Sequence, residues 1–337
     1  MKRIAVNGIG RIGRMFLRLA IGRKDIEIVA LNDTQLDAKT LAYFLKYDSV
    51  YGRYSKNVTA KEGGIEVDGV FIPLLTEREP DKLPWKEKNV DLVVEATGIF
   101  LSYDGKNGAA RHLSAGAKQV LLSVPPKGDG AEKIPQIVYG VNEGIYDPKV
   151  HRVVSAASCT TNSLVPIAYV LEEEFGIVHA FLTTVHAYTG GQKTVDSASK
   201  SLTRGRAAAV NIIPTTTGAA TATSKVIPTL AGKMDGMAFR VPVLTGSASD
   251  FVAEMKQEIS ADEVNDAFRR YADGKLVGVL GVSDDPLVSS DIIGDPRASV
   301  VDLSCTRVVD RTLLKVVTFY DNEWGYTNQL LRVATLL

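Results

Sequence analysis

The sequence predicts an α/β protein with two domains: a doubly wound parallel sheet first, then an α+β domain with a mixed, largely antiparallel sheet. Over residues 1–158, short apolar runs alternate with helical patterns, as strands buried on both faces of a parallel sheet require. Segments after residue 158 are longer and alternate between polar and apolar side chains, which is typical of a sheet with one face in water. The length of 337 residues suits two domains.

The first half of the chain alternates predicted strands and helices. Residues 3–6 are predicted to form a strand, and the following helix is predicted from apolar residues that share one helical face. A Gly-rich patch at 63–69 predicts one hairpin turn between Val58 and Phe71. The other predicted strands of this half cover 26–31, 90–96, 119–124 and 153–156, and the other helical patterns cover 39–45 and 108–117.

The second half begins with a predicted helix over 161–175. The polar stretch 188–206 is too long for a passive connector and predicts a functional or interface loop. We therefore place the domains at 1–158 and 159–319, with the C-terminal segment 320–337 packing back on the first domain. Further helices are predicted over 261–272 and 327–334, and strands over 178–186, 237–243, 248–255, 299–306 and 313–320.

The composition excludes several classes of protein. Hydrophobic residues make up 45% and charged residues 23%, which is ordinary for a globular chain and not for a disordered one. Lys plus Arg equals Asp plus Glu at 39 each, so net charge gives no reason to expect nucleic acid or a membrane surface as the main partner. The N-terminus lacks the apolar core of a signal peptide, and no stretch approaches the roughly 18 apolar residues of a membrane span. Two cysteines build neither a disulfide framework nor a zinc site, so we expect a cytoplasmic protein without a metal.

A glycine motif follows the first predicted strand. Gly8, Gly10 and Gly13 open the predicted helix, and Asp33 ends the next strand. Glycines allow a tight turn and a close backbone approach, and a helix N-terminus favours a pyrophosphate. Asp33 can accept hydrogen bonds from ribose hydroxyls and repels a 2′-phosphate, which favours NAD. The motif predicts a Rossmann-type dinucleotide-binding domain; the alternative is a Gly-rich turn that only packs helix on strand.

Cys159 and His186 are the candidate reactive side chains. Cys159 lies between a predicted strand and a predicted helix, where the helix N-terminus would lower the pKa of the thiol and favour a nucleophile. His186 ends a predicted strand just before the long polar loop, where a general base facing a cleft could lie. A buried cysteine and a hydrogen-bonded structural histidine are the alternatives. The setting of Cys305 suggests only a buried residue.

Six motifs carry a resemblance to a known family. In chain order they are NGIGRIGR (7–14), SCTTN (158–162), HAYTGGQK (186–193), NIIPTTTGAA (211–220), AFRVPV (238–243) and YDNEWGY (320–326). Together they cover nearly the whole chain and resemble phosphorylating glyceraldehyde-3-phosphate dehydrogenase, an oxidoreductase of glycolysis and glucose metabolism. The 27 residues from Cys159 to His186 match the family's spacing as well.

The resemblance implies a mechanism. Cys159 would attack the aldehyde of glyceraldehyde 3-phosphate, and His186 would activate the thiol and then accept the hemithioacetal proton as hydride leaves for NAD. Inorganic phosphate would attack the resulting thioester and release 1,3-bisphosphoglycerate. The residues implied for the anions are Thr189 and Arg240 at the substrate's C3 phosphate, and Ser158, Thr160, Thr217 and Gly218 at the attacking phosphate.

The resemblance also implies a cofactor site and an assembly. Asn322 would hold the nicotinamide carboxamide. The loop 188–206 corresponds to the family's S-loop, which packs near a neighbouring subunit's cofactor, so a homotetramer is implied. The other cofactor-binding residues implied are Gly8, Arg11, Ile12, Asp33, Arg78, Thr97, Gly98 and Ser123.

Departures from the family pattern leave alternatives open. Small residues at 197–199, with Thr34 and Arg78, resemble photosynthetic members that accept NADP as well as NAD. A close rival is erythrose-4-phosphate dehydrogenase, which releases a carboxylic acid; the threonine and glycine of NIIPTTTGAA argue against it. Aspartate-semialdehyde dehydrogenase is a poorer match, because its cysteine motif differs from the SCTTN of this chain. From another class, the chain could be a non-catalytic nucleotide- or RNA-binding regulator, which the presence of both Cys159 and His186 disfavours.

Overall fold

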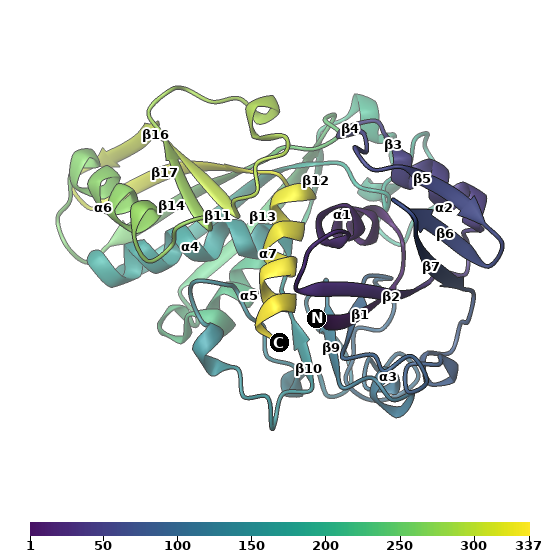
Figure 1. The fold of residues 1–337 in the computed structure, drawn as a ribbon. Helices are drawn as coiled ribbons and strands as arrows, with labels where there is room; N and C mark the ends of the chain where they lie inside the picture. The colour runs from purple at the N-terminus through teal and green to yellow at the C-terminus, as the bar shows by residue number, and fades with distance from the viewer. The chain divides into compact units, whose positions relative to one another are not determined.

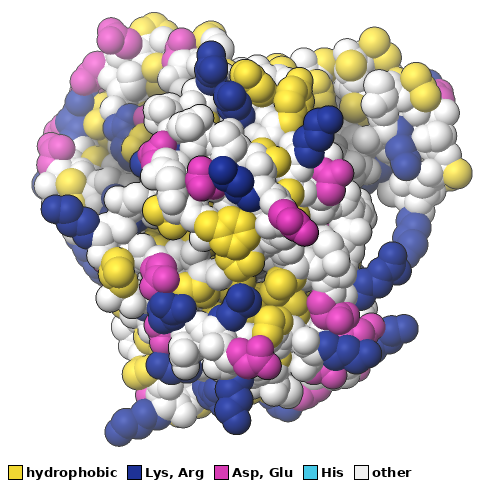
Figure 2. Space-filling model, turned by 45° about the vertical axis from the view of Figure 1, so that its right-hand side comes forward, with side chains coloured by type: hydrophobic (Ala, Val, Ile, Leu, Met, Phe, Trp, Pro, Cys, Tyr) yellow, Lys and Arg dark blue, Asp and Glu magenta, His cyan; other side chains and the backbone are white.

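The computed structural model describes all 337 residues (Figure 1). The chain divides into two compact units. Unit 1 comprises Met1–Ile137, Glu143–Ala157 and Leu330–Leu337, and unit 2 comprises Val138–Asn142 and Ser158–Gln329. None of the helices combines the length and the apolar character that a bilayer crossing needs. Lys and Arg are interspersed with Asp and Glu on the face drawn in Figure 2.

An eight-stranded sheet, in the order β10-β9-β8-β1-β2-β7-β6-β5, forms the centre of unit 1. The strands from β10 to β7 pair in parallel, and β6 and β5 continue the sheet antiparallel. The strands are β1 (Lys2–Asn7), β2 (Ile26–Asn32), β5 (Val58–Lys61), β6 (Gly64–Val67), β7 (Val70–Leu75), β8 (Leu92–Glu95), β9 (Gln119–Leu122) and β10 (Val153–Ser155). The helices are α1 (Arg11–Ala20), α2 (Ala38–Lys46) and α3 (Arg111–Ser114), and a small two-stranded sheet pairs β3 (Tyr47–Asp48) with β4 (Gly52–Arg53).

The parallel strands of unit 1 are apolar because both faces of the sheet are covered. Ala5, Val93 and Val120, on β1, β8 and β9, are fully buried in one cluster with Trp85. At the carboxyl ends the pattern changes to polar residues, since Asn7 pairs in register with Asn32 on one side and Glu95 on the other. The sequence therefore places polar side chains at one edge of an apolar sheet.

Two predictions for unit 1 were wrong in detail. The patch at 63–69 contains two turns, one before β6 and one after it, so the sheet edge is an antiparallel meander and not a single hairpin. The helix predicted over 108–117 shrinks to the four residues of α3. The cause lies outside the segment: the amides of Ala109 and Ala110 bond to the carbonyls of Ser102 and Tyr103, which holds this stretch in a turn.

Unit 2 contains a seven-stranded mixed sheet in the order β12-β13-β11-β14-β17-β16-β15. Helices α4, α5 and α6 pack against its strands (Figure 1). The strands are β11 (Ile177–Ala187), β12 (Ile213–Thr216), β13 (Met234–Val241), β14 (Ser247–Met255), β15 (Leu280–Ser283), β16 (Ser299–Val309) and β17 (Leu313–Tyr320). The helices are α4 (Cys159–Glu174), α5 (Ala219–Val226), α6 (Ala261–Asp273) and α7 (Trp324–Leu336), whose residues from Leu330 onward belong to unit 1.

The mixed sheet confirms the predicted fold class, while three short elements escaped prediction. β11 pairs in parallel with β13 and antiparallel with β14, so the sheet mixes both kinds of pairing. β12, α5 and β15 were not predicted. β12 contains Pro214, which argues against a strand in a sequence read alone, yet it pairs along its length with β13 at the sheet edge.

Candidate active site and nucleotide cavity

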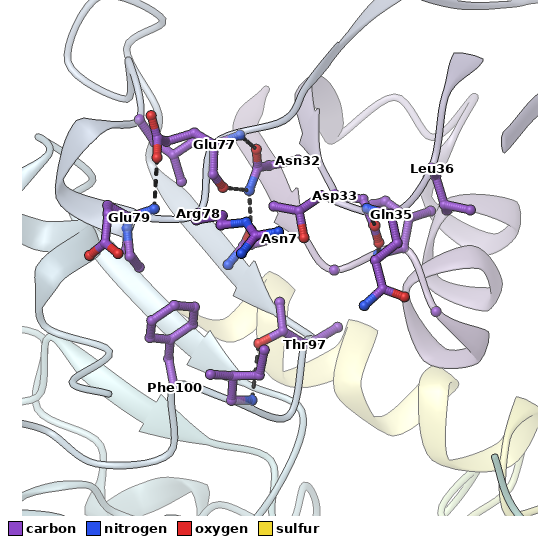
Figure 3. Close-up of a pocket in the computed structure, with 18 of the residues that line it drawn as sticks. Asn7, Asn32, Asp33, Gln35, Leu36, Glu77, Arg78, Glu79, Thr97 and Phe100 are labelled. Atoms are coloured by element: carbon purple, nitrogen blue, oxygen red, sulfur yellow. Dashed lines mark hydrogen bonds between the residues drawn. The ribbon is translucent and has the colours of Figure 1, made fainter. Parts of the chain in front are cut away.

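Unit 1 holds a cavity of about 670 Å³ at the carboxyl edge of its parallel strands. Asn7 and Asn32, the last residues of β1 and β2, line it, and so do Ala96 and Thr97, which follow β8. Figure 3 shows Asn7, Asn32, Asp33 and Thr97 around this space. Doubly wound sheets bind ligands in a crevice at this edge, where strands end in loops.

The glycines of the first motif shape the wall of this cavity. Gly8 has φ +90°, and a Cβ there would lie 2.5 Å from the amide nitrogen of Thr97, so only glycine fits. Gly10 precedes α1, and a Cβ on it would meet no atom within 4 Å. Gly10 therefore leaves the helix N-terminus open to a close-lying ligand, which suits the pyrophosphate of a dinucleotide.

Asp33 fastens the glycine loop to the end of β2. Its Oδ2 accepts a hydrogen bond from the Ile9 amide at 2.8 Å, and its Oδ1 accepts one from the Gln35 amide at 2.8 Å. A carboxylate has about four acceptor positions, so both oxygens retain capacity for ribose hydroxyls. Thr34 and Arg78 line the same cavity.

A buried polar network holds Thr97 in place. Glu95 Oε1 accepts from the backbone amide and the hydroxyl of Thr97, and Glu95 Oε2 accepts from the side-chain amide of Asn7 at 2.6 Å. The indole of Trp85 donates to Nδ1 of His112 at 2.9 Å, so the ring proton lies on Nε2, which donates to Glu95 Oε2 at 3.1 Å. This network fixes one wall of the cavity.

Four of the predicted cofactor residues of unit 1 do not line the cavity. Gly8, Asp33, Arg78 and Thr97 line the cavity, whereas Arg11, Ile12, Gly98 and Ser123 are not part of its lining. Arg11 forms an ion pair with Asp48. Ser123 is buried, and its amide donates to the Glu95 carbonyl at 3.0 Å.

Cys159 and His186 lie in direct contact in unit 2. Ser158 is the N-cap of α4, and its Oγ accepts from the Thr161 amide at 3.1 Å, so the helix begins at Cys159 and not at 161. His186 is the second-last residue of β11. The distance from Cys159 Sγ to His186 Nε2 is 3.4 Å. The fold thus joins a thiol at a helix start to an imidazole at a strand end.

Two neighbours contact Nδ1 of His186 and favour opposite tautomers of the ring. The Ala187 carbonyl oxygen, 2.6 Å from Nδ1, can only accept and favours a proton on Nδ1. Arg240 Nη1, which also donates to the Ala187 carbonyl at 3.0 Å, can only donate and favours a lone pair on Nδ1. With the proton on Nδ1, the lone pair of Nε2 faces Sγ and His186 can accept a proton from Cys159.

Both members of this pair are neutral in the free protein. Burial lowers the pKa of His186 from its ordinary value of 6.5 to about 3, and the positive charge of Arg240 acts in the same direction. Burial raises the pKa of the Cys159 thiol, and this effect outweighs the opposing influence of Arg240 and Thr160. The expectation that the helix start would lower this thiol pKa was therefore wrong for the free protein.

Arg240 is a buried cation beside the pair. On β13 it stands in register with His186 on β11 and with Ile213 on β12. Its Nε is buried and has no hydrogen-bond acceptor, and burial lowers the pKa of its guanidinium. A cation with a free donor next to a nucleophile fits an anionic substrate. Thr189 follows β11 and is exposed.

Thr217 and Gly218 lie at the start of α5. The Thr217 hydroxyl accepts from the Ala219 amide at 3.2 Å, and Gly218 is the N-cap. Neither makes a hydrogen bond with Cys159 or His186. Asn322, the predicted carboxamide ligand, is buried, and its Oδ1 accepts from Ser247 Oγ at 3.0 Å and from Thr245 Oγ1 at 3.2 Å.

Two further residues beside the pair escaped prediction. The Tyr320 hydroxyl bonds to Thr160 at 3.0 Å and to Thr184 at 2.8 Å, and its ring meets that of His186 edge-on with centroids 6.0 Å apart. Thr184 shares a strand face with His186 two residues later, and this alternation could have identified it. Tyr320 opens the motif that contains Asn322, but its contact with Thr160 spans 160 residues. No group of three or more His, Cys, Asp and Glu side chains could hold a metal ion.

Comparisons with known proteins agree on one family. Residues 2–103 match the model of the glyceraldehyde 3-phosphate dehydrogenase NAD binding domain, and residues 158–322 match that of the family's C-terminal domain. The chain is 51% identical to glyceraldehyde-3-phosphate dehydrogenase 2 of Streptomyces avermitilis over 99% of this chain and 98% of the relative. It is 49% identical to the Thermotoga maritima enzyme of the same name, over 100% of this chain and 99% of that one. The Geobacillus stearothermophilus enzyme is 48% identical, over 99% of this chain and 98% of that one. Unit 1 has a Rossmann-type cavity, unit 2 has a cysteine–histidine pair, and two family models and full-length relatives match the sequence; this chain therefore belongs to the glyceraldehyde-3-phosphate dehydrogenase family.

Proposed function

We propose that this protein is a phosphorylating glyceraldehyde-3-phosphate dehydrogenase, which oxidises glyceraldehyde 3-phosphate to 1,3-bisphosphoglycerate through a thioester on Cys159. The observation that carries the proposal is the 3.4 Å contact between Cys159 Sγ and His186 Nε2. A thiol and an oriented base are the parts that acyl chemistry on cysteine needs.

In the first half of the reaction, His186 Nε2 takes the thiol proton as Sγ bonds to the aldehyde carbon. The proton then moves to the new oxygen and gives a hemithioacetal. His186 takes that hydroxyl proton as the carbon loses hydride, and a thioester remains on Cys159. The Cys159 amide at the start of α4 is a donor for the developing oxyanion.

In the second half, an oxygen of inorganic phosphate bonds to the thioester carbon, and the sulfur leaves. His186 returns its proton to the sulfur, which restores the neutral pair, and the proton of the phosphate passes to solvent. Arg240 and Thr189 are proposed for the C3 phosphate, and Ser158, Thr160, Thr217 and Gly218 for the attacking phosphate. The free Nε donor and the charge of Arg240 support an anion there.

NAD is the cofactor of the family's N-terminal domain, and when bound it accepts the hydride. The fit is supported by the open space at Gly10 and by Asp33, whose oxygens have spare acceptor capacity for ribose hydroxyls. Asn322 is proposed to bind the carboxamide. NADP is a second candidate cofactor, because Thr34 and Arg78 line the same cavity and Arg78 could pair with a 2′-phosphate.

A steady-state assay of the purified protein tests this function. Reduced cofactor should form from glyceraldehyde 3-phosphate only when phosphate or arsenate is present. Turnover without phosphate would favour the acid-releasing relative that acts on erythrose 4-phosphate, and binding of nucleotide without any turnover would favour a regulator. Comparing kcat/KM for NAD and NADP decides the cofactor, and activity confined to NAD would exclude dual use.

Three broader features belong to the same proposal. Residues 1–158 would form the dinucleotide-binding domain, with 320–337 packing back on it, and 159–319 the catalytic domain. The protein would be a cytoplasmic homotetramer whose loop 188–206 contributes to a subunit interface. Exposed apolar side chains in and near this loop, among them Val195 and Leu202, support an interface. Analytical ultracentrifugation of the purified protein tests the tetramer.

A further inference from the structure

Tyr320 connects helix α4, which begins at Cys159, with strand β11, which carries His186. It is the last residue of β17 and is 2% exposed. Its hydroxyl lies 3.0 Å from Oγ1 of Thr160, the residue after the nucleophile, and 2.8 Å from Oγ1 of Thr184, two residues before His186. The three hydroxyls form one chain, Thr184–Tyr320–Thr160.

Counting protons gives this chain a direction. Each of the three hydroxyls has one proton, and two contacts consume two of them. Thr184 is 1% exposed, and the Tyr320 oxygen is the only hydrogen-bond partner of its hydroxyl. If Tyr320 donated to Thr184, the Thr184 proton would be left buried without an acceptor, which is costly. Thr184 therefore donates to Tyr320, and Tyr320 donates to Thr160.

This direction turns the proton of Thr160 toward the nucleophile. Because the Thr160 oxygen already accepts from Tyr320, its own proton points away from Tyr320, and its other partner is Cys159 Sγ, a long contact at 4.0 Å. Burial raises the pKa of Tyr320, so the phenol keeps the proton that it donates. A hydroxyl that accepts one hydrogen bond becomes a better donor in the next, since hydrogen-bonded chains polarise one another.

We infer that Tyr320 is a positioning residue that commits the Thr160 hydroxyl to donate a hydrogen bond to the inorganic phosphate that attacks the thioester. The inference rests on the proposed function, in which Thr160 binds that phosphate. Tyr320 itself touches neither substrate nor cofactor. It acts by fixing the direction in which the Thr160 hydroxyl donates. Thr184 acts through Tyr320, because its own donation fixes the direction in which the Tyr320 hydroxyl donates.

The variant Tyr320→Phe tests this inference because it keeps the ring against His186 and removes only the hydroxyl. We expect the KM for inorganic phosphate to rise about five-fold to ten-fold, the loss of roughly one hydrogen bond. The kcat at saturating phosphate and the KM values for glyceraldehyde 3-phosphate and NAD should stay within about two-fold. Thr184→Val should raise the KM for phosphate in the same direction but less.

A readout without turnover accompanies the kinetics. Iodoacetamide alkylates Cys159, and phosphate bound near the sulfur should slow that alkylation. The phosphate concentration that gives half-maximal protection should rise in Tyr320→Phe by the same factor as the KM. If Tyr320→Phe fails to fold, Thr184→Val provides both measurements, since it leaves the Tyr320 ring in place.

Thr318→Val is the matched control. Thr318 lies two residues earlier on β17, is fully buried, and bonds to Ser299 Oγ at 2.5 Å, with no hydrogen bond to Thr160. The Thr318→Val variant loses a buried hydroxyl from the same strand, and its KM and protection constant for phosphate should equal those of the wild type. If Thr318→Val changes them as much as Tyr320→Phe does, the effect is a general loss of packing and the inference is overturned.

Thr160→Val separates the inference from the proposed function. If Thr160→Val leaves the phosphate constants unchanged, the proposed role of Thr160 is wrong. If Thr160→Val raises them while Tyr320→Phe and Thr184→Val leave them at the wild-type values, Thr160 binds phosphate without help and the inference alone is overturned. If the phosphate constants rise in Thr160→Val, Tyr320→Phe and Thr184→Val and stay at the wild-type values in Thr318→Val, the inference is supported.

Discussion

Cys159 and His186 form a neutral pair whose reactivity depends on one proton transfer. The burial that raises the pKa of the thiol also lowers that of the imidazole, so the free protein holds little thiolate. Nε2 of the ring nevertheless lies 3.4 Å from the sulfur. We expect the thiolate to form as the aldehyde is attacked, with His186 taking the proton in the same step.

Acid should destabilise the fold through His186. Its pKa is about 3 in the folded chain and 6.5 ordinarily, so the unfolded state binds the proton first as pH falls. The contribution to the free energy of unfolding is complete above pH 6.5 and is lost progressively toward pH 3. Urea denaturation at pH 7 and pH 4 should show a larger loss for the wild type than for His186→Asn. Equal losses in the two proteins would contradict the lowered pKa.

Removing the base should slow acylation without preventing it. In His186→Asn the thiol must lose its proton to water, so we expect the first-turnover rate with glyceraldehyde 3-phosphate to fall by about 10² to 10⁴. Stopped-flow formation of reduced cofactor measures this rate. His179→Asn is the control, because His179 is exposed and its ring lies near Glu254, so it should react at the wild-type rate. An unchanged rate in His186→Asn would remove His186 from the mechanism.

At the scale of elements, two glycines of the same motif have different roles: Gly8 is required for the fold, and Gly10 leaves space for the cofactor. Gly8→Ala should destabilise the fold, because the methyl would lie 2.5 Å from the Thr97 amide at φ +90°. Gly10→Ala should fold normally, since nothing lies within 4 Å, but should weaken NAD binding by filling the open space. Thermal unfolding and calorimetric titration of NAD measure the two. Equal Tm losses in both variants would contradict the argument.

Helix α6 offers a stability test away from the site. The Ser260 hydroxyl accepts from the Glu263 amide, and the Glu263 carboxylate accepts from the Ser260 amide at 2.8 Å, so both donors of the helix start are satisfied. Ser260→Ala should lower the free energy of unfolding by about 1 kcal/mol. Ser224→Ala on α5 removes an exposed hydroxyl that is not a cap and should change it by less than about 0.5 kcal/mol. A smaller loss for Ser260→Ala than for Ser224→Ala would show that the two reciprocal hydrogen bonds of Ser260 and Glu263 contribute nothing.

The elements that the sequence predicted share one property: their pattern is local. The apolar runs of β1, β2 and β8 and the helical face of α6 are visible within a dozen residues, and all four formed within a few residues of their predicted ends. β12 could not be found in this way, because its partner β13 begins at Met234, 18 residues after β12 ends at Thr216, and its own sequence contains a proline. The turn at 108–110 was missed for the same reason, since its amides bond back to an irregular loop.

At the scale of the whole molecule, the candidate site combines residues that no local pattern connects. Cys159 and His186 could be singled out because each stands at the end of an element, and the resemblance supplied their pairing. The contact of Tyr320 on β17 with Thr160 on α4 joins residues 160 positions apart in the sequence and was not predictable from spacing. The pKa of the thiol depends on how tightly the surrounding chain packs, which is why the sequence argument gave the wrong direction.

The most direct test of the central claim is a single-turnover experiment without phosphate. Mixing the NAD-loaded protein with glyceraldehyde 3-phosphate should give one reduced cofactor per active site and an acyl group on the Cys159 peptide by mass spectrometry, and added phosphate should then start continuous turnover. Cys159→Ala should bind NAD as the wild type does and give no burst. A burst in Cys159→Ala, or sustained turnover of the wild type without phosphate or arsenate, would contradict the thioester mechanism.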